Sequence, residues 1–248
     1  MISDMIYDNM IELRSRLLKI NAGTVLDVAC GKGDFLKFAL RSFNSYRMAV
    51  GIDADAESLL KARQNLYEYP VSFVLGSALS MPFLEESFTT VTLSNALHHI
   101  EDLSKLFSEM IRVCRPDGFI LVNEMINDSV SEYQESHILY HHYVSELDNL
   151  LGHYHRETYS EKELLNLVKE YNLKISDSFV HEDCSKDYLN PGEIDGMADR
   201  MNQKVSLLKN TDSYYFYLNK ARDIEKKIRN KGVHRPKHMT FLIKPVRP

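Results

Sequence analysis

Apolar residues in the first half of the chain fall into short runs separated by segments with helical spacing. The runs are bounded by Gly, Asp or Asn, a pattern typical of strands buried in a sheet. The segments between them repeat apolar side chains every three or four residues, which predicts amphipathic helices. We therefore expect strands at 24–28, 47–52, 71–75, 90–94 and 119–123, and helices at 3–20, 34–43, 56–67 and 103–114.

The second half of the chain carries more helix and less strand. Ser160 and Glu163 have the spacing of a capping box, and Asn190 before Pro191 is a typical helix start. Gly232 is a stop signal for the helix that precedes it. We expect helices at 129–151, 160–171 and 212–229, a further helix from Asn190, and strands at 173–180 and 239–244.

Strands that alternate with helices at this spacing predict a doubly wound α/β fold with a seven-stranded, mostly parallel sheet. The additional helices interrupt that rhythm without any linker of low complexity. We interpret the chain as one domain, 1–248, with an N-terminal helix at 1–20 and a ligand-binding half at 21–125. The segments 126–160 and 185–235 are expected to be insertions that form a helical cap.

Composition and charge narrow the possible functions. The chain has 248 residues, 44% of them hydrophobic, and no apolar run long enough to span a membrane. The start of the chain lacks the basic residues of a signal peptide, and the three cysteines form neither a disulfide framework nor a zinc cluster. We therefore expect a cytoplasmic protein.

Charge is unevenly distributed along the chain. The net charge is −5, and because residues 181–248 carry 14 Lys and Arg against nine Asp and Glu, the preceding part is strongly acidic. An acidic main body argues against a nucleic-acid substrate. The basic segment 220–237 leaves open an anionic substrate or partner, although a solvated helix face is the simpler interpretation.

The segment from Val25 to Phe35 carries the most specific chemistry. A predicted strand ends in a turn with Gly31 and Gly33, and a helix follows. Glycines there let the backbone approach a ligand, and the helix start offers unpaired N–H groups. Asp53 ends the next strand, 20 residues after Gly33, where a carboxylate can accept hydrogen bonds from both ribose hydroxyls.

Two features distinguish between nucleotide ligands. A dinucleotide fingerprint needs a third glycine, and this chain has Leu36 at that position. Asp27 inside the motif would repel a pyrophosphate, whereas it could hold the ammonium group of a methionine moiety, directly or through water. A structural role for Asp27 in capping the turn stays open as an alternative.

These residues resemble the first motif of class I S-adenosylmethionine-dependent methyltransferases, in particular the small-molecule group that includes ubiquinone- and menaquinone-biosynthesis-type enzymes. Three further blocks, at 76–83, 87–99 and 112–118, resemble that group's adenine-side loop, fourth-strand motif and turn before strand five. The resemblance covers residues 20–125. It implies a Rossmann-like methyltransferase fold, S-adenosyl-L-methionine as cofactor, and methyl transfer to a small-molecule acceptor by in-line displacement.

The resemblance also implies which residues contact the cofactor. The family has an acid in the adenine-side loop where this chain has Ser77. This difference weakens the expected hydrogen bonding to the adenine. The implied contacts are Asp27, Ala29, Cys30, Gly31, Gly33, Asp53, Ala54, Ser77, Ala78, Asn95 and Ala96.

Methyl transfer needs a general base only when the acceptor must lose a proton. His98 and His99, just past the fourth strand, are the candidates for that catalytic role, with Asn95 and Glu124 nearby; a packing role for the two histidines is the alternative. Asn95 is not followed by Pro-Pro, which disfavours the pattern of enzymes that methylate amino groups of DNA and RNA.

Histidines and tyrosines are frequent in the expected cap. His137 and His141 are four residues apart, a spacing that can chelate a metal, but no acidic third ligand has diagnostic spacing, so we predict no metal site. The tyrosines of the same segment are expected to be core residues, although they could enclose a cationic or planar substrate.

Other functions remain to be distinguished. A protein that binds S-adenosylmethionine or S-adenosylhomocysteine without turnover is conceivable because of Ser77, and an NAD-type oxidoreductase is disfavoured by Asp27 and Leu36. We expect no arsenic methylation, because only Cys184 lies outside the motifs. A homodimer stays open as an alternative to a monomer.

Overall fold

The computed structural model describes residues 9–128 and 130–246, and the chain divides into two compact units. The sheet unit takes its described residues from 9–124, 162–184 and 238–246, and the helical unit from 125–161 and 185–237. In chain order the elements are α1 (Ile11–Leu17), β1 (Thr24–Val28), α2 (Asp34–Ser42), β2 (Met48–Asp53), α3 (Ala56–Asn65), β3 (Val71–Leu75), β4 (Phe88–Ser94), the 3-10 helix η2 (Leu97–His99), α4 (Leu103–Val113), β5 (Cys114–Met125), α5 (Glu132–Leu150), α6 (Glu161–Glu170), β6 (Lys174–His181), α7 (Pro191–Ser206), α8 (Tyr214–Lys231) and β7 (His238–Lys244).

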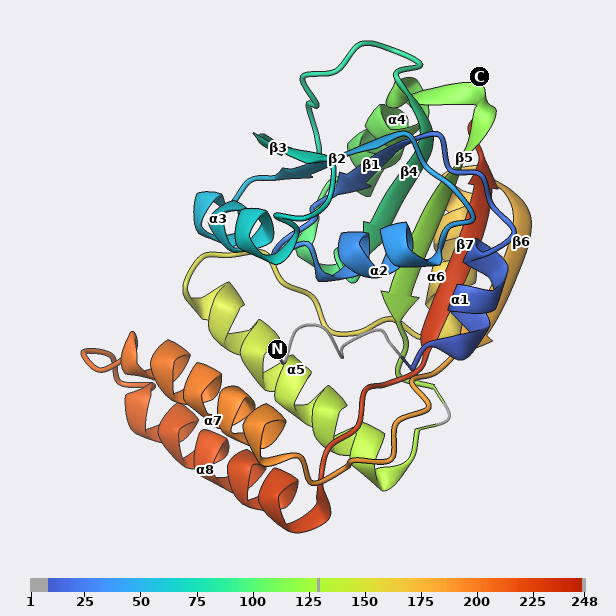
Figure 1. The fold of residues 1–248 in the computed structure, drawn as a ribbon. Helices are drawn as coiled ribbons and strands as arrows, with labels where there is room; N and C mark the ends of the chain where they lie inside the picture. The colour runs from blue at the N-terminus through green and yellow to red at the C-terminus, as the bar shows by residue number, and fades with distance from the viewer. Residues whose placement is uncertain (1–8, 129, 247–248) are drawn as a thin grey trace. The chain divides into compact units, whose positions relative to one another are not determined.

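The sheet unit is built on seven strands in the order β3-β2-β1-β4-β5-β7-β6. The strand pairs from β3 to β5 are parallel, and β6 pairs with β7 in antiparallel orientation. In Figure 1, α1 and α2 lie in front of this sheet and α4 and α6 lie behind it. The predicted doubly wound, mostly parallel sheet is thereby confirmed.

Burial explains why β1 and α2 form where they do. All five side chains of β1 are buried, as expected for a central strand covered on both faces. One core cluster joins Leu13 and Leu17 of α1 to Leu36 of α2, and strand residues such as Leu121 pack in the same cluster. The helix α1 is therefore part of the core of the sheet unit.

Several boundaries differ from the sequence prediction. The expected helix at 3–20 is confirmed only as α1, and its positions 3–8 lie outside the described residues. Cys114, expected to end a helix, instead starts β5, because the α conformation is disfavoured just ahead of Pro116. Strand β5 is accordingly longer than predicted at both ends.

The helical unit has its own core. Side chains of α5, α7 and α8, among them Leu147, Met201 and Ile224, form one buried cluster. Asn190 caps α7 as predicted, since its side chain accepts a hydrogen bond from the Glu193 N–H. The helix α8 ends at Gly232, which has a φ of 91°, as predicted.

The start of α5 differs from the prediction. Ser131 is the N-cap and forms a capping box with Gln134, so the helix begins later than the expected position 129, which itself lies outside the described residues. The predicted capping box of Ser160 and Glu163 stays a prediction. Among the described residues, no helix combines the length and the apolar character needed to cross a bilayer.

Candidate functional site

The turn between β1 and α2 has an unusual backbone. Ala29 and Gly31 have φ values of 51° and 52°, and Gly33, the N-cap of α2, has a φ of 77°. The turn is held by the Gly33 N–H, which donates to the Cys30 carbonyl at 2.8 Å, and by the Cys30 N–H, which donates to the Ile52 carbonyl at 3.0 Å. Left-handed conformations favour glycine, which accounts for Gly31 and Gly33 at two of the three positions with positive φ.

The two glycines of the turn have different roles. A Cβ atom at Gly31 would meet nothing within 4 Å, whereas a Cβ at Gly33 would lie 2.4 Å from Cδ1 of Leu66. Gly33 therefore allows α2 to pack close to the end of α3. Only Gly31 leaves open space beside the backbone, so the expectation that both glycines serve ligand approach is retained for Gly31 alone.

Asp53 connects the turn to the end of β2. The Gly31 N–H donates to Asp53 Oδ2 at 2.7 Å, and the Asp55 N–H donates to Asp53 Oδ1 at 2.8 Å. These two bonds fix the carboxylate, and each oxygen retains a lone pair for another donor. Asp53 is half-buried, so its side chain is held in place and still reachable from solvent.

Asp27 is the most perturbed acid of the sheet unit. It is 1% exposed, and Oδ1 accepts a hydrogen bond from the Thr92 hydroxyl at 2.6 Å. Burial raises the pKa of Asp27 to about 7, the Thr92 bond opposes that rise, and the charge of Asp53 adds to it. A carboxyl group that is destabilised in its charged form beside a turn with open space is a candidate partner for a cation.

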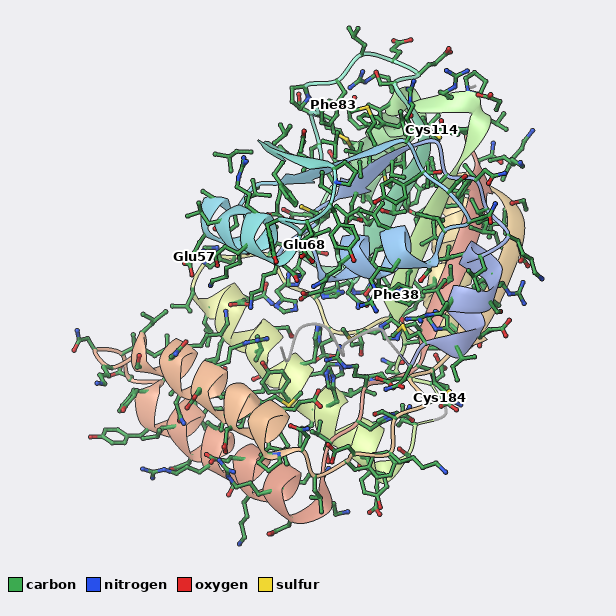
Figure 2. The ribbon with its side chains drawn as sticks, viewed as in Figure 1. Phe38, Glu57, Glu68, Phe83, Cys114 and Cys184 are labelled. Carbon is green, nitrogen blue, oxygen red and sulfur yellow. The ribbon has the colours of Figure 1, made fainter. Side chains whose placement is uncertain are left out.

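Cys30 packs inside the turn. A Cβ on Gly51 of β2 would lie 2.8 Å from the Cys30 sulfur, so Gly51 makes room for this side chain. Burial raises the pKa of Cys30, and burial raises that of Cys114 to about 12, so both thiols stay protonated at neutral pH. Cys184 is exposed, and Figure 2 labels it apart from Cys114.

The loop after β3 carries the expected adenine-side residues. Ser77 is exposed, and its hydroxyl oxygen accepts a hydrogen bond from the Leu79 N–H at 3.1 Å. Ala78 is half-buried, and Ala54, after β2, is exposed. The Ser77 hydroxyl is therefore partly committed to its own turn.

The loop after β4 brings a histidine and a carboxylate together. His98 Nδ1 donates to Glu124 Oε1 at 2.8 Å, and the Leu97 N–H donates to Glu124 Oε2 at 2.9 Å. His98 is 2% exposed and Glu124 is fully buried. A carboxylate that accepts from Nδ1 sets the tautomer of a neutral imidazole, which makes Nε2 the acceptor nitrogen.

Asn95, Ala96 and His99 surround this pair along the chain. Asn95 has a φ of 50°, and its N–H donates to the Asn123 carbonyl at 2.8 Å. Its side-chain Nδ2 lies 3.2 Å from Nε2 of His238. Ala96 is buried, whereas His99 is exposed and its ring lies against that of His98, with 4.4 Å between centroids.

The topology gathers these loops at one edge of the sheet. Strands β3, β2, β1 and β4 are neighbours and parallel, so their carboxyl ends meet there. Open α/β sheets bind ligands at this edge. Hydrogen bonds directly connect the turn at Gly31 with Asp53, while the residues after β3 and β4 flank them.

A buried polar network that the sequence did not predict lies farther along the sheet. His181 Nε2 is 3.0 Å from Asn123 Oδ1 and 2.9 Å from the Thr240 hydroxyl. Burial lowers the pKa of His181 to about 4, so the ring is neutral at physiological pH. The three residues are more than 50 positions apart in the chain, which no local pattern reveals.

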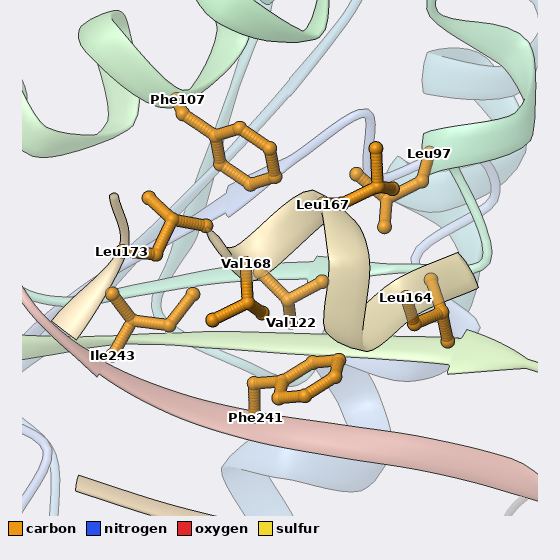
Figure 3. A pocket seen from close by; sticks show the side chains of 9 residues that line it. All are labelled: Leu97, Phe107, Val122, Leu164, Leu167, Val168, Leu173, Phe241 and Ile243. Atoms are coloured by element: carbon orange, nitrogen blue, oxygen red, sulfur yellow. The ribbon is translucent and has the colours of Figure 1, made fainter. Parts of the chain in front are cut away.

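An apolar cavity of the sheet unit lies on the α6 side. Leu97, Phe107, Leu164 and Phe241 are among its lining residues, which are all apolar (Figure 3). A ribose or a sulfonium needs polar partners, so this cavity does not suit the cofactor. Leu97 lines the cavity, and its neighbour His98 belongs to the loop after β4.

Two histidines of the helical unit, His141 and His155, form a hydrogen-bonded chain with Asp148. His155 Nδ1 donates to Asp148 Oδ2 at 2.8 Å, and His155 Nε2 lies 3.3 Å from His141 Nε2. Lys204 also contacts Asp148 through its ammonium group. His137 has a pKa lowered to about 3 by burial and by the charges of Arg235, His234 and Arg200. Tyr140 and Tyr143 are core residues, as expected for part of the tyrosine set.

The comparisons with known proteins agree with the fold and the motif. Residues 26–122 match the family model described as "Methyltransferase domain". The chain is 29% identical over 113 residues to a 2-phytyl-1,4-naphtoquinone methyltransferase of Thermosynechococcus vestitus, covering 45% of this chain and 50% of that protein. The chain spans about half the length of the curated relatives that it matches first.

Solved structures share the architecture at low identity. The YcgJ protein of Bacillus subtilis superposes with a TM-score of 0.54 at 21% identity, over 96% of this chain and 97% of that one. The geranyl diphosphate C-methyltransferase of Streptomyces coelicolor, solved with Mg²⁺, geranyl diphosphate and S-adenosylhomocysteine, gives a TM-score of 0.51 at 15% identity, over 95% and 79%. Residues 26–122 are therefore similar to a methyltransferase domain, and the chain shares the fold of the solved structures named above.

Proposed function

We propose that this chain transfers the methyl group of S-adenosyl-L-methionine to a small-molecule acceptor. The observation that carries the proposal is the turn at Gly31, which leaves open space beside its backbone and is bonded to the carboxylate of Asp53. The position of this turn within the matched methyltransferase domain supports the same ligand.

The residues at this edge suit the cofactor in three respects. Asp53 is held by two backbone N–H groups and keeps lone pairs for ribose hydroxyls. Asp27 offers a buried carboxylate to the ammonium group of the methionine moiety. Gly31 admits the ligand where a side chain would repel it.

When bound, S-adenosylmethionine supplies a methyl group on a sulfonium whose departure leaves a neutral thioether. The acceptor's lone pair forms the new bond to the methyl carbon as the carbon–sulfur pair returns to sulfur. Catalysis then depends on alignment and desolvation of the acceptor. We propose that His98 Nε2 takes a proton from acceptors that must lose one, because Glu124 fixes the ring and its tautomer. His99 is the second candidate for this role.

A transfer assay with methyl-labelled S-adenosylmethionine and a panel of small acceptors tests the proposal. Replacement of His98 by Gln should lower kcat by about 100-fold, the usual contribution of a general base. His153→Gln, at an exposed position of the helical unit, is the matched control and should leave kcat unchanged. If kcat falls in His99→Gln and not in His98→Gln, His99 is the general base. Cofactor binding without any transfer across the panel would favour a binding protein without turnover.

The helical cap, the homodimer and the cytoplasmic location stay predictions. The cap proposal is that 126–160 and 185–235 hold the acceptor. It is supported by the separate core that α5, α7 and α8 form.

A further inference from the structure

Among the described residues, the buried polar atoms of the helical unit that lack a hydrogen-bond partner include Nδ1 of His137 and Nε2 of His234. Buried polar groups in folded proteins are nearly always bonded, so each exception requires a reason. A ligand that accepts or donates hydrogen bonds at these atoms would supply one.

These two nitrogens and the ring of Tyr140 come from one region of the helical unit. His137 and Tyr140 are on α5, with ring centroids 6.1 Å apart. His234 follows α8, and its N–H donates to the carbonyl of Tyr133 at 3.1 Å, one helical turn before His137. His234 is 9% exposed and Tyr140 is 5% exposed.

Two guanidinium groups face the same region. The charges of Arg200 and Arg235 both lower the pKa of His137. Through its charge and a hydrogen bond, Arg200 also opposes the rise that burial imposes on the pKa of Tyr140. Arg200 is exposed and has no ion pair within the described ranges. The positive charge therefore exceeds what the neighbouring side chains neutralise.

The nearby acids are already engaged. Glu193 lies 3.7 Å from Arg235, at the outer limit of an ion pair. The charge of Asp148 raises the pKa of Tyr140, and the Asp148 carboxylate already forms ion pairs with His155 and Lys204. Elsewhere in the basic segment 220–237, part of the positive charge is neutralised within the helical unit. Lys220, for example, forms an ion pair with Glu146 on α5.

An aromatic wall adjoins the charged groups. The rings of Tyr133 and Tyr188 are stacked, with centroids 4.3 Å apart and an interplanar angle of 14°. The ring of Tyr188 also meets that of His234 edge to face at 5.1 Å. Such a wall can pack against the apolar body of a ligand whose charged end the guanidinium groups bind.

We propose that His137, Tyr140, Arg200, His234 and Arg235, here called the cationic cluster, bind the carboxylate or phosphate group of a small molecule. The shared chemistry is an anion with several acceptor oxygens, which two guanidinium groups and orphaned donors satisfy together. That this anion belongs to the methyl acceptor rests on the proposed function. The binding itself does not.

Titration of the full chain with inorganic phosphate, and separately with acetate, tests the proposal without any transfer reaction. Imidazole signals followed by NMR, with His137 assigned through His137→Gln, report on occupancy. Bound anion should raise the pKa of His137 above its present value near 3, because an opposite charge favours the protonated ring. The anion that acts at lower concentration identifies the phosphate or carboxylate source.

Arg200→Gln should weaken binding about tenfold, as expected for loss of a charge-assisted hydrogen bond. Arg200 is exposed, so this variant should fold, which circular dichroism would check. Arg222→Gln on α8, which makes the same charge change at another exposed position, should bind normally. Equal losses in both variants, or no shift of the His137 signal with either anion, would overturn the proposal. A positive titration with a failed transfer assay would keep the anion site and remove only the acceptor assignment.

Discussion

The turn between β1 and α2 in the sheet unit and the cationic cluster of the helical unit are built in opposite ways. In the turn, backbone atoms do most of the work: positive φ angles at Ala29 and Gly31 and N–H groups that hold Asp53. In the cluster, long side chains from α5, α7 and the segment after α8 converge on buried orphan atoms. A site formed by consecutive backbone atoms can be predicted from a short stretch of sequence. A site formed by side chains that are distant in the chain cannot.

The substitution with the largest expected effect is at Asp53, beside the turn of the sheet unit. Asp53→Ala removes the acceptor of two backbone N–H bonds and the proposed acceptor of the ribose hydroxyls. We expect affinity for S-adenosylhomocysteine to fall about 100-fold, consistent with the loss of two hydrogen bonds to a charged group. Calorimetry measures this, and phosphate binding to the cationic cluster should not change.

The neighbouring Asp55 supplies the control for that experiment. Asp55 caps α3 by accepting from the Glu57 and Ser58 N–H groups. Asp55→Ala should therefore lower the free energy of unfolding by about 1 kcal/mol and leave cofactor affinity nearly intact. Equal loss of affinity in both variants would mean that Asp53 acts only through the stability of the turn.

The two glycines of the turn should separate stability from binding. Gly33→Ala forces a Cβ against Leu66 at a φ of 77°, so we expect a loss of about 2–4 kcal/mol in the free energy of unfolding. Gly31→Ala meets open space and should cost only about 1 kcal/mol, yet it should weaken cofactor binding more than tenfold. Denaturant unfolding and calorimetry on both variants would reveal a reversed order, which would contradict the assigned roles.

Asp27 should make cofactor binding depend on pH. With a pKa of about 7, Asp27 is mostly protonated at pH 6 and charged at pH 8, so affinity for the cationic cofactor should rise about tenfold over that range. Asp27→Asn should remove the dependence and bind weakly at both pH values. Affinity that is independent of pH in the natural protein would argue for the purely structural role.

The raised pKa of Asp27 also affects the free energy of unfolding of the unliganded protein, which should fall as pH rises. Because the folded pKa lies above the unfolded value of 3.8, stability is lost as pH rises from about 4 to about 7, by at most about 4 kcal/mol. His137 and His181, whose pKa values are lowered, act in the other direction below pH 6.5. The informative quantity is therefore the difference in unfolding free energy between the natural protein and Asp27→Asn, which should grow in favour of the variant toward pH 7.

The smallest expected effect concerns the helical unit alone. Asn190→Ala removes the cap of α7 and should cost about 1 kcal/mol of unfolding free energy without changing cofactor affinity. Thermal unfolding measures the cost. A change in cofactor affinity of similar size would contradict the assignment of cofactor binding to the sheet unit.

The sequence predicted the first half of the fold well because its signals are local. The strands at 24–28 and 71–75 agree with the structure residue by residue, since short apolar runs bounded by turn residues leave little freedom. The end of the helix before Cys114 was misplaced by one residue because periodicity outweighed the restriction that Pro116 imposes.

The candidate site was predictable only in part. The identity of Gly31 and Asp53 followed from spacing, but the different roles of Gly31 and Gly33 depend on Leu66, more than 30 positions away. The bond between His98 and Glu124 joins the ends of two adjacent strands, which the topology permits and no motif states. The cationic cluster spans residues 137–235, so only a folded structure brings its members together.

Calorimetric titration of the full chain with S-adenosylhomocysteine and, in parallel, with NAD tests the central claim most directly. The account predicts saturable binding of S-adenosylhomocysteine with one site per chain and no binding of NAD, because Gly31, Asp53 and Asp27 suit the nucleoside of a thioether and repel a pyrophosphate. Binding of NAD with equal affinity, or no binding of S-adenosylhomocysteine to a folded chain, would contradict it.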